Sequence, residues 1–191
     1  MAAYTSVDRL LAALPLEADD QPTREALGTL AEGVSGELDE LLGGTFGDDE
    51  AVTAIMDGTA DRKLYLPGPG AALLLSVDEN GVPLDPSLYE LEPRLGRFLL
   101  RLDAGGALSW WTVAERGITL VYVPNTAPRS LQEVCYDECL RRWHAKPGGS
   151  QDVAGVDGHT ARRAPRGFTD HTYAIVASVR ATYFIRNLVA I

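Results

Sequence analysis

The feature that most constrains the fold is a run of short apolar segments between Val52 and Val123, broken by turn-forming residues about every ten positions. Segments of this length, rich in Val, Ile, Leu and aromatic residues, are typical of strands in a small antiparallel sheet or sandwich. Asp57-Gly58 predicts a hairpin between residues 52–56 and 62–66. Asn80-Gly81 predicts a second hairpin, between residues 73–77 and 82–84.

Helical periodicity appears on both sides of this block. A short helix is expected over Val7–Leu14, capped by Thr5 or Ser6, and a longer one from Pro22 to the Gly43-Gly44 pair. After the block, Ser130 is expected to cap a helix that runs from Leu131 to about Ala145. Within the long N-terminal helix, Gly33 and Gly36 are unfavourable, and we expect them to mark close packing against a neighbour.

The C-terminal segment is rich in β-branched and aromatic residues, so a strand remains possible there. A helix is favoured because five apolar positions form one stripe at helical spacing. These positions are Ala174, Ala177, Ala181, Phe184 and Leu188.

The sequence therefore predicts an α+β fold: a helical bundle of about four helices with an inserted antiparallel β-hairpin or sheet block. We expect one domain, residues 1–191. Its predicted parts are N-terminal helices (1–44), a β-rich insertion (51–123), a helix (128–146), a loop (147–169) and a C-terminal helix or arm (170–191).

Charge is distributed unevenly along the chain. The formal net charge is −10, and residues 1–61 hold fourteen acidic side chains against two arginines. Residues 128–191 hold six acidic and nine basic side chains. An acidic N-terminal part argues against nucleic-acid binding there and is also typical of a solvated helical face. We expect no membrane span, since the apolar C-terminal residues are interrupted by Arg180, Arg186 and Asn187, and we recognise no signal peptide.

The sequence contains few candidates for chemistry. Cys135, Cys139, His144 and His159 contain the donor types of a zinc site, but their spacing matches no common zinc module. Two reduced thiols packed on one helix face are the simpler interpretation. We find no nucleophile elbow and no phosphate-binding loop. We therefore expect no enzyme activity, no metal and no cofactor.

Candidate contact residues fall in two regions. In a strand, adjacent Trp110 and Trp111 must point to opposite faces, so one indole points outward unless the sheet is buried on both sides. The outward indole would anchor a subunit contact, because Trp is enriched at interface hot spots. Arg162, Arg163 and Arg166 suit an acidic surface of a neighbouring chain, although a solvated loop is equally compatible with them.

The order of these elements resembles the head–tail connector (adaptor) proteins of long-tailed bacteriophages, prophages and gene transfer agents. The resemblance covers Thr5 to His144. The chain departs from the family pattern at Pro124-Asn125-Thr126-Ala127-Pro128, where a glycine-containing loop is usual, and in the long extension from Lys146 to Ile191. The resemblance rests on Ser6-Val7-Asp8-x-x-Leu11, Leu41-Leu42-Gly43-Gly44, Asp57-Gly58, Leu64-Tyr65-Leu66-Pro67-Gly68, Ser76-Val77-x-x-Asn80-Gly81-x-x-Leu84, Tyr89-x-Leu91, Gly96-Arg97-x-Leu99, Trp110, Ile118-x-Leu120-Val121-Tyr122, Pro128 and Leu131.

The resemblance implies a structural virion protein in the neck of a particle made in a bacterial cytoplasm. About twelve copies would form a ring under the portal protein, enclose DNA without reading its sequence, and dock a stopper or tail-terminator protein. Within such a ring we expect subunit contacts through Tyr89, Trp110 and Trp111. We also expect a portal contact through Arg162, Arg163, Arg166, Phe184, Ile185, Leu188 and Ile191.

Three other functions remain open. Another ring-forming virion component, such as a head-completion or tail-terminator protein, would bind different neighbours. A soluble enzyme would need a pocket with ionisable groups of shifted pKa. A nucleic-acid-binding regulator would bind DNA in a salt-sensitive way, which a sequence pI near 4.7 disfavours.

Overall fold

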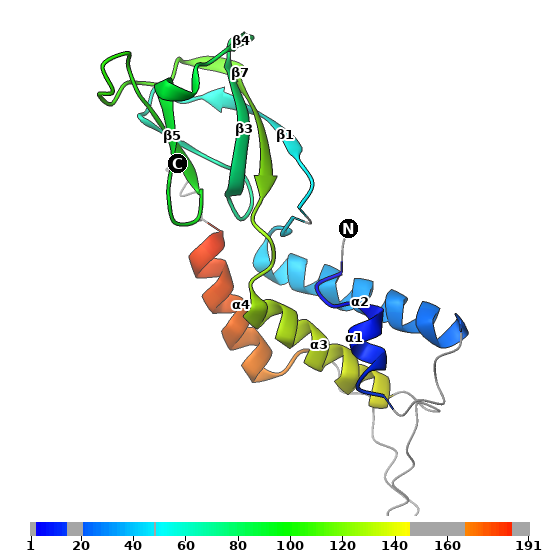
Figure 1. The fold of residues 1–191 in the computed structure, drawn as a ribbon. Helices are drawn as coiled ribbons and strands as arrows, with labels where there is room; N and C mark the ends of the chain where they lie inside the picture. The colour runs from blue at the N-terminus through cyan, green and yellow to red at the C-terminus, as the bar shows by residue number, and fades with distance from the viewer. Residues whose placement is uncertain (1–2, 15–20, 48, 146–166, 185–191) are drawn as a thin grey trace, which may run out of the picture. The chain divides into compact units, whose positions relative to one another are not determined.

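The computed structural model describes residues 3–14, 21–47, 49–145 and 167–184. They form a mixed α+β fold with helices and antiparallel sheets, as the sequence predicts (Figure 1). Two compact units can be distinguished. The first comprises Met1–Leu42 and Ala127–Val179, and the second comprises Gly43–Thr126 and Arg180–Ile191.

The first unit is helical. Its core is a set of aliphatic side chains from three helices, with the two cysteines among them: Leu10, Leu27, Ala31, Val34, Leu38, Leu131, Val134, Cys135 and Cys139 are all buried. Over the described residues its helices are α1 (Val7–Leu11), α2 (Gln21–Leu42), α3 (Arg129–His144) and α4 (Asp170–Tyr183), the last turn of α4 belonging to the second unit.

The helix boundaries follow local capping chemistry. Ser6 caps α1, since its Oγ accepts a hydrogen bond from the Arg9 backbone N–H at 3.2 Å. The prediction that Ser130 caps the third helix is wrong, because α3 begins at Arg129, two residues earlier than predicted, with Pro128 at the N-cap position. Proline fixes its own φ near the value needed there, and the Leu131 and Gln132 N–H groups donate to the Pro128 carbonyl.

Helix α4 is confirmed as a helix, but its predicted apolar stripe is wrong. Its buried residues are Thr172, Val176 and Val179, whereas the three alanines of the predicted stripe are exposed. Valine buries more apolar area than alanine, and Thr172 gains hydrogen bonds when it is buried. The helix face with the threonine and the two valines is therefore the one that packs inward. The packing expected at Gly33 and Gly36 is also not made within the described chain, since nothing there lies within 4 Å of an added Cβ at either glycine.

The second unit contains two antiparallel sheets. Its core is formed by residues from both sheets and the loop before β7, among them Leu64, Leu99, Trp111, Ile118 and Leu120. The larger sheet has the strand order β1 (Val52–Gly58), β7 (Ala114–Pro124), β3 (Ala71–Glu79), β4 (Val82–Pro83); the smaller has the order β2 (Lys63–Tyr65), β6 (Phe98–Arg101), β5 (Tyr89–Leu91).

One predicted hairpin is confirmed and the other is wrong. Asn80 and Gly81 have φ of 54° and 76° and join β3 to β4. By contrast, β1 pairs with β7 and β2 pairs with β6, so Asp57-Gly58 closes no hairpin. Gly58 lies opposite Ala114, and a Cβ there would stand 1.8 Å from the Thr112 carbonyl oxygen. This glycine serves close backbone approach rather than a turn.

The Gly43–Thr126 segment of the second unit begins and ends at neighbouring points. Gly47 and Thr126 form a parallel bridge, and the Gly47 N–H donates to the Asn125 carbonyl at 3.1 Å. Between these points lie all the strands of the two sheets. None of the described helices has the length and apolar character that crossing a bilayer requires.

Candidate assembly surfaces

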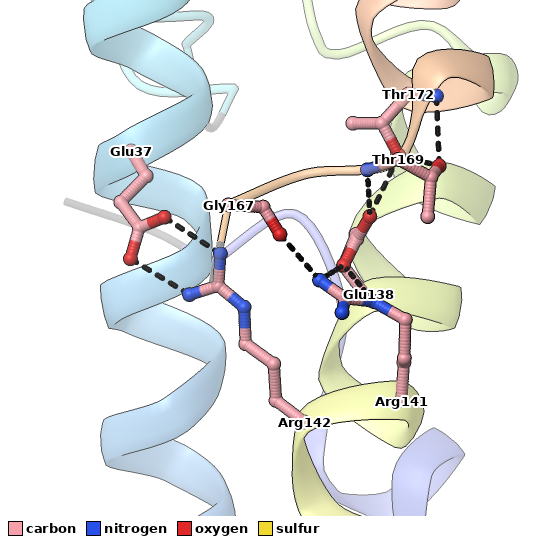
Figure 2. A network of polar contacts seen from close by, with 7 residues as sticks. All are labelled: Glu37, Glu138, Arg141, Arg142, Gly167, Thr169 and Thr172. Carbon is pink, nitrogen blue, oxygen red and sulfur yellow. Dashed lines mark hydrogen bonds and ion pairs between the residues drawn. The ribbon is translucent and has the colours of Figure 1, made fainter. Parts of the chain in front are cut away.

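A buried carboxylate organises the first unit (Figure 2). Glu138 of α3 is 2% exposed, and its Oε1 accepts hydrogen bonds from the Thr172 hydroxyl at 2.8 Å and the Thr169 N–H at 3.2 Å. Its Oε2 accepts from Arg141 Nε at 2.6 Å, and the Arg141 guanidinium also donates to the Gly167 carbonyl. A buried charge is tolerated when paired and hydrogen-bonded in this way. The network therefore fixes the start of α4 against α3.

A second ion pair joins α2 to α3. The two guanidinium NH₂ groups of Arg142 each donate to one carboxylate oxygen of Glu37 at 2.7 Å, a bidentate pairing visible in Figure 2. The hydrogen bonds from Arg142 lower the pKa of Glu37 below its ordinary value of 4.5, and those to Glu37 raise the pKa of Arg142. Arg142 also stacks over the Phe168 ring at 5.0 Å.

This pair predicts an acid-sensitive step in stability. Because the folded pKa of Glu37 lies below the unfolded value, its contribution is present above about pH 4.5 and is lost as the pH falls through the lowered pKa. Arg142→Gln should therefore flatten the fall in urea midpoint between pH 6 and pH 3. The exposed pair Arg24–Asp8 supplies the control, since Arg24→Gln should leave that slope nearly unchanged. Equal slopes in the two variants would refute a role for Glu37 in acid sensitivity.

In the second unit, Glu79 fixes the loop that carries the two tryptophans. The Thr112 N–H donates to Glu79 Oε1 at 2.8 Å, and Arg101 pairs with Oε2 at 3.2 Å. Burial alone would raise the pKa of Glu79, but the Thr112 and Arg101 hydrogen bonds outweigh it and lower the pKa below 4.5. The backbone N–H of Trp111 donates to the backbone carbonyl of Asp61 at 2.9 Å.

The two tryptophans point to different environments. Trp111 is 1% exposed in the core, whereas Trp110 is 59% exposed with Arg62 stacked over it at 5.0 Å. The strand expected at Trp110 and Trp111 does not form, since an isolated bridge, Leu102↔Leu108, is the only strand pairing of residues 108–113. Glu79 and Asp61 take the backbone N–H groups that a neighbouring strand would otherwise pair.

Of the three predicted subunit-contact residues, Trp110 is the most exposed. Trp111 belongs to the core, so a neighbouring chain has no access to it. Tyr89 is half-buried and packs against the same core, and burial raises the pKa of its hydroxyl. The candidate contact at this end of the unit therefore centres on Trp110, with exposed Leu108 and Val113 near it in sequence.

Among the predicted portal-contact residues, the structure describes only Phe184. Its ring lies edge-on to Phe46 at 5.3 Å, and Tyr183 lies edge-on to the same ring at 5.1 Å. The Thr182 carbonyl accepts from Arg97 at 3.3 Å. Six other predicted residues lie outside the described residues: Arg162, Arg163, Arg166, Ile185, Leu188 and Ile191.

The cysteines pack as predicted. Cys135 and Cys139 are both free thiols and fully buried, and the hydrogen bond that the Cys139 thiol donates to Cys135, together with burial, raises the pKa of Cys139. Within the described ranges, no three His, Cys, Asp or Glu side chains gather closely enough to hold a metal ion. His144 is exposed, and His159, the fourth ligand of the zinc hypothesis, lies outside those ranges.

The sequence did not identify three residues whose hydrogen bonds fix neighbouring segments, namely Glu138, Thr172 and Glu79. A signal for Glu138 exists: it lies seven residues after Leu131, on the same helix face as the buried Cys135. A carboxylate at a core position predicts hydrogen-bonding partners, which here are Arg141 of the same helix and two threonines, Thr169 and Thr172, at the start of α4.

The comparisons with known proteins place the fold. No protein family and no curated protein matches the sequence. Several solved structures share the fold, and three of them each cover most of this chain. "Neck of native GTA particle computed with C12 symmetry" contains a chain with 11% identity and a TM-score of 0.55, over 91% of this chain and 87% of the other.

The other two structures come from the same kind of particle. "Virion of native gene transfer agent (GTA) particle" contains a chain with 12% identity and a TM-score of 0.56, over 95% and 90% of the two chains. "Neck of empty GTA particle computed with C6 symmetry" gives 14% identity and a TM-score of 0.53, over 91% and 85%. The chain thus shares its fold with components of virion-like particles.

Proposed function

We propose that this protein is a structural adaptor in the neck of a phage-like particle. The observation that carries the proposal is the fold match over nine tenths of the chain to neck and virion components, one of them computed with twelvefold symmetry. The likeness covers both the helices and the sheets, because it spans 91–95% of this chain.

In this proposal about twelve copies form a ring beneath the portal protein, extend the DNA channel, and dock a stopper or tail-terminator protein. The charge distribution supports it. Residues 1–61 carry fourteen acidic side chains, so a channel surface built from this region would repel the phosphate backbone and let DNA slide. Trp110 supplies an exposed aromatic anchor for a contact between copies.

The portal contact is assigned to the basic residues of the 147–169 region and the apolar C-terminal arm. The arm follows Phe184, which is seated on Phe46. Arg162, Arg163 and Arg166 would pair with acidic groups of the portal, and Ile185, Leu188 and Ile191 would bury apolar area against it.

Electron microscopy of the purified chain mixed with its portal protein tests this function. We expect a ring of this chain stacked on the portal. Deletion of residues 185–191 should abolish stacking and leave the thermal midpoint unchanged, whereas deletion of residues 1–2 should preserve stacking. Rings that cap tail tubes and ignore the portal would instead identify a tail-terminator protein, and a monomer that binds neither would overturn the adaptor function.

A further inference from the structure

The turn between β3 and β4 places an exposed asparagine directly before an exposed glycine. Asn80 and Gly81 both have positive φ, 54° and 76°, as a type I′ turn requires. A side-chain amide that precedes glycine is open to attack by the glycine nitrogen, because glycine has no Cβ to hinder the approach. Nothing lies within 4 Å of an added Cβ at Gly81, so the surroundings leave room for this rearrangement.

The reacting groups are not restrained by hydrogen bonds. In the part of the chain that the structure describes, the Asn80 side-chain amide has no hydrogen-bond partner, and the Gly81 N–H donates none of the turn hydrogen bonds. The Asn80 backbone N–H does donate, to the Gly117 carbonyl at 2.6 Å. This bond involves neither the side-chain carbon that is attacked nor the nitrogen that attacks it.

The end of the hairpin is weakly held. Its strands pair through Asp78↔Pro83 and Glu79↔Val82, and a proline has no N–H to donate to the ladder. Val82 is 62% exposed. Local opening costs little free energy where backbone hydrogen bonds are few and the residues are exposed. Opening leaves the peptide bond at the turn free to rotate into the conformation that ring closure needs.

We propose that Asn80 is a site of intramolecular deamidation. The Gly81 backbone nitrogen attacks Cγ of the Asn80 side chain, a bond forms between these two atoms, and the Cγ–Nδ2 bond breaks. Nδ2 leaves as ammonia with the proton of the Gly81 N–H, and a cyclic imide remains. Water then opens the imide at one of its two carbonyls, which gives aspartate or isoaspartate at position 80. The inference does not depend on the proposed function.

Isoaspartate at this position acts on the loop that carries Trp110. Its backbone runs through the former side chain and is one methylene longer, which disrupts the register that a two-residue turn sets. The neighbouring Glu79 ends β3, and its carboxylate accepts from the Thr112 N–H at 2.8 Å and pairs with Arg101 at 3.2 Å. Loss of the Glu79↔Val82 pairing therefore loosens the residue that holds this loop.

Asn125 provides a matched comparison within the same unit. Its Nδ2 donates to the Pro69 carbonyl at 2.9 Å and to the Leu95 carbonyl at 2.6 Å, so its side chain is fixed. The next residue, Thr126, is β-branched and hinders attack by its own nitrogen. The two asparagines therefore differ in both conditions that ring closure requires, a free side chain and an unhindered nitrogen.

Incubation of the purified chain at 37 °C in neutral buffer tests the modification. Peptide mass mapping after digestion under mildly acidic conditions measures amide loss at each asparagine, and an isoaspartyl methyltransferase with labelled S-adenosylmethionine detects isoaspartate. Amide loss at Asn80 should be at least roughly tenfold faster than at Asn125, because the side chain of Asn125 is held. Asn80→Ser should remove methyl acceptance from the peptide that spans residue 80. Equal rates at the two asparagines, or an Asn80 amide that survives unchanged, would overturn the proposal.

Hydrogen exchange measures the consequence for the loop. Each product carries one more negative charge than the amide, so ion exchange separates the deamidated chains from the unmodified ones. In chains that contain isoaspartate, exchange should rise across residues 109–113. Freshly prepared Asn80→Asp is the control, since it adds the charge without lengthening the backbone, and aspartate tolerates a positive φ. Its exchange should match that of the unmodified chain. Unchanged exchange in the isoaspartate chains would overturn the link between Asn80 and the Trp110 loop.

Discussion

Gly96→Ala is expected to destabilise the second unit by about 3–5 kcal/mol. Gly96 has a φ of 57°, and a Cβ there would lie 1.9 Å from the Ala71 carbonyl oxygen and 2.8 Å from its carbon. These are backbone atoms held in place, since Ala71 pairs with Pro124 and its N–H donates to the Gly96 carbonyl at 2.9 Å. The clash can be relieved only by separating β3 from the turn before β6.

Gly81→Ala provides the matched control for this prediction. Gly81 also has a positive φ, 76°, but nothing lies within 4 Å of an added Cβ. Gly81→Ala should therefore lower the free energy of unfolding only by the backbone strain, about 1 kcal/mol. Urea unfolding followed by tryptophan fluorescence measures both variants. Equal losses at the two glycines would show that backbone conformation, and not close approach to Ala71, explains the requirement for glycine.

Glu138→Ala is expected to cost about 3 kcal/mol in the first unit and to release α4 from α3. The substitution removes the acceptor of the Thr172 hydroxyl, the Thr169 N–H and the Arg141 guanidinium at once. Thr172 is buried and Arg141 is half-buried, so these two donors each lose a bond that water cannot fully replace. Hydrogen exchange should rise along Asp170–Tyr183 more than along α2.

The neighbouring Asp137 is exposed on the same helix and supplies the control. Asp137→Ala should change stability by less than about 0.5 kcal/mol. If Glu138→Ala left exchange in α4 unaltered, the valine contacts of α4 would be sufficient to hold it, and the polar network would be secondary.

The fold class was predictable from the sequence because two strong periodicities alternate along it. The helical repeat before Gly43 and after Pro128 and the turn at Asn80-Gly81 are local signals, and the structure confirms the elements they predict. Strand pairing was not predictable from Asp57-Gly58, because the partner of β1 is β7, some sixty residues later. A local turn signal cannot show that a glycine is needed because a carbonyl from a distant part of the chain approaches it closely.

The orientation of α4 shows a second limit of sequence reasoning. The alanine stripe and the Val176–Val179 side are both apolar, so periodicity alone does not choose between them. The Thr172 side of α4 is buried because the Thr172 hydroxyl donates a hydrogen bond to Glu138, which lies thirty-four residues earlier in the sequence. Likewise, the adjacency of Trp110 and Trp111 predicts one buried and one exposed indole, which is the arrangement observed, although no strand imposes it.

The bridge between Gly47 and Thr126 has an evolutionary consequence. Because the segment that carries all the described strands begins and ends at paired residues, it can be enlarged, exchanged or shortened without altering the separation of its two ends. Mutation can therefore change the β unit of such a protein and leave the helical sequence around it untouched. Related proteins are expected to differ most in the length and content of this segment.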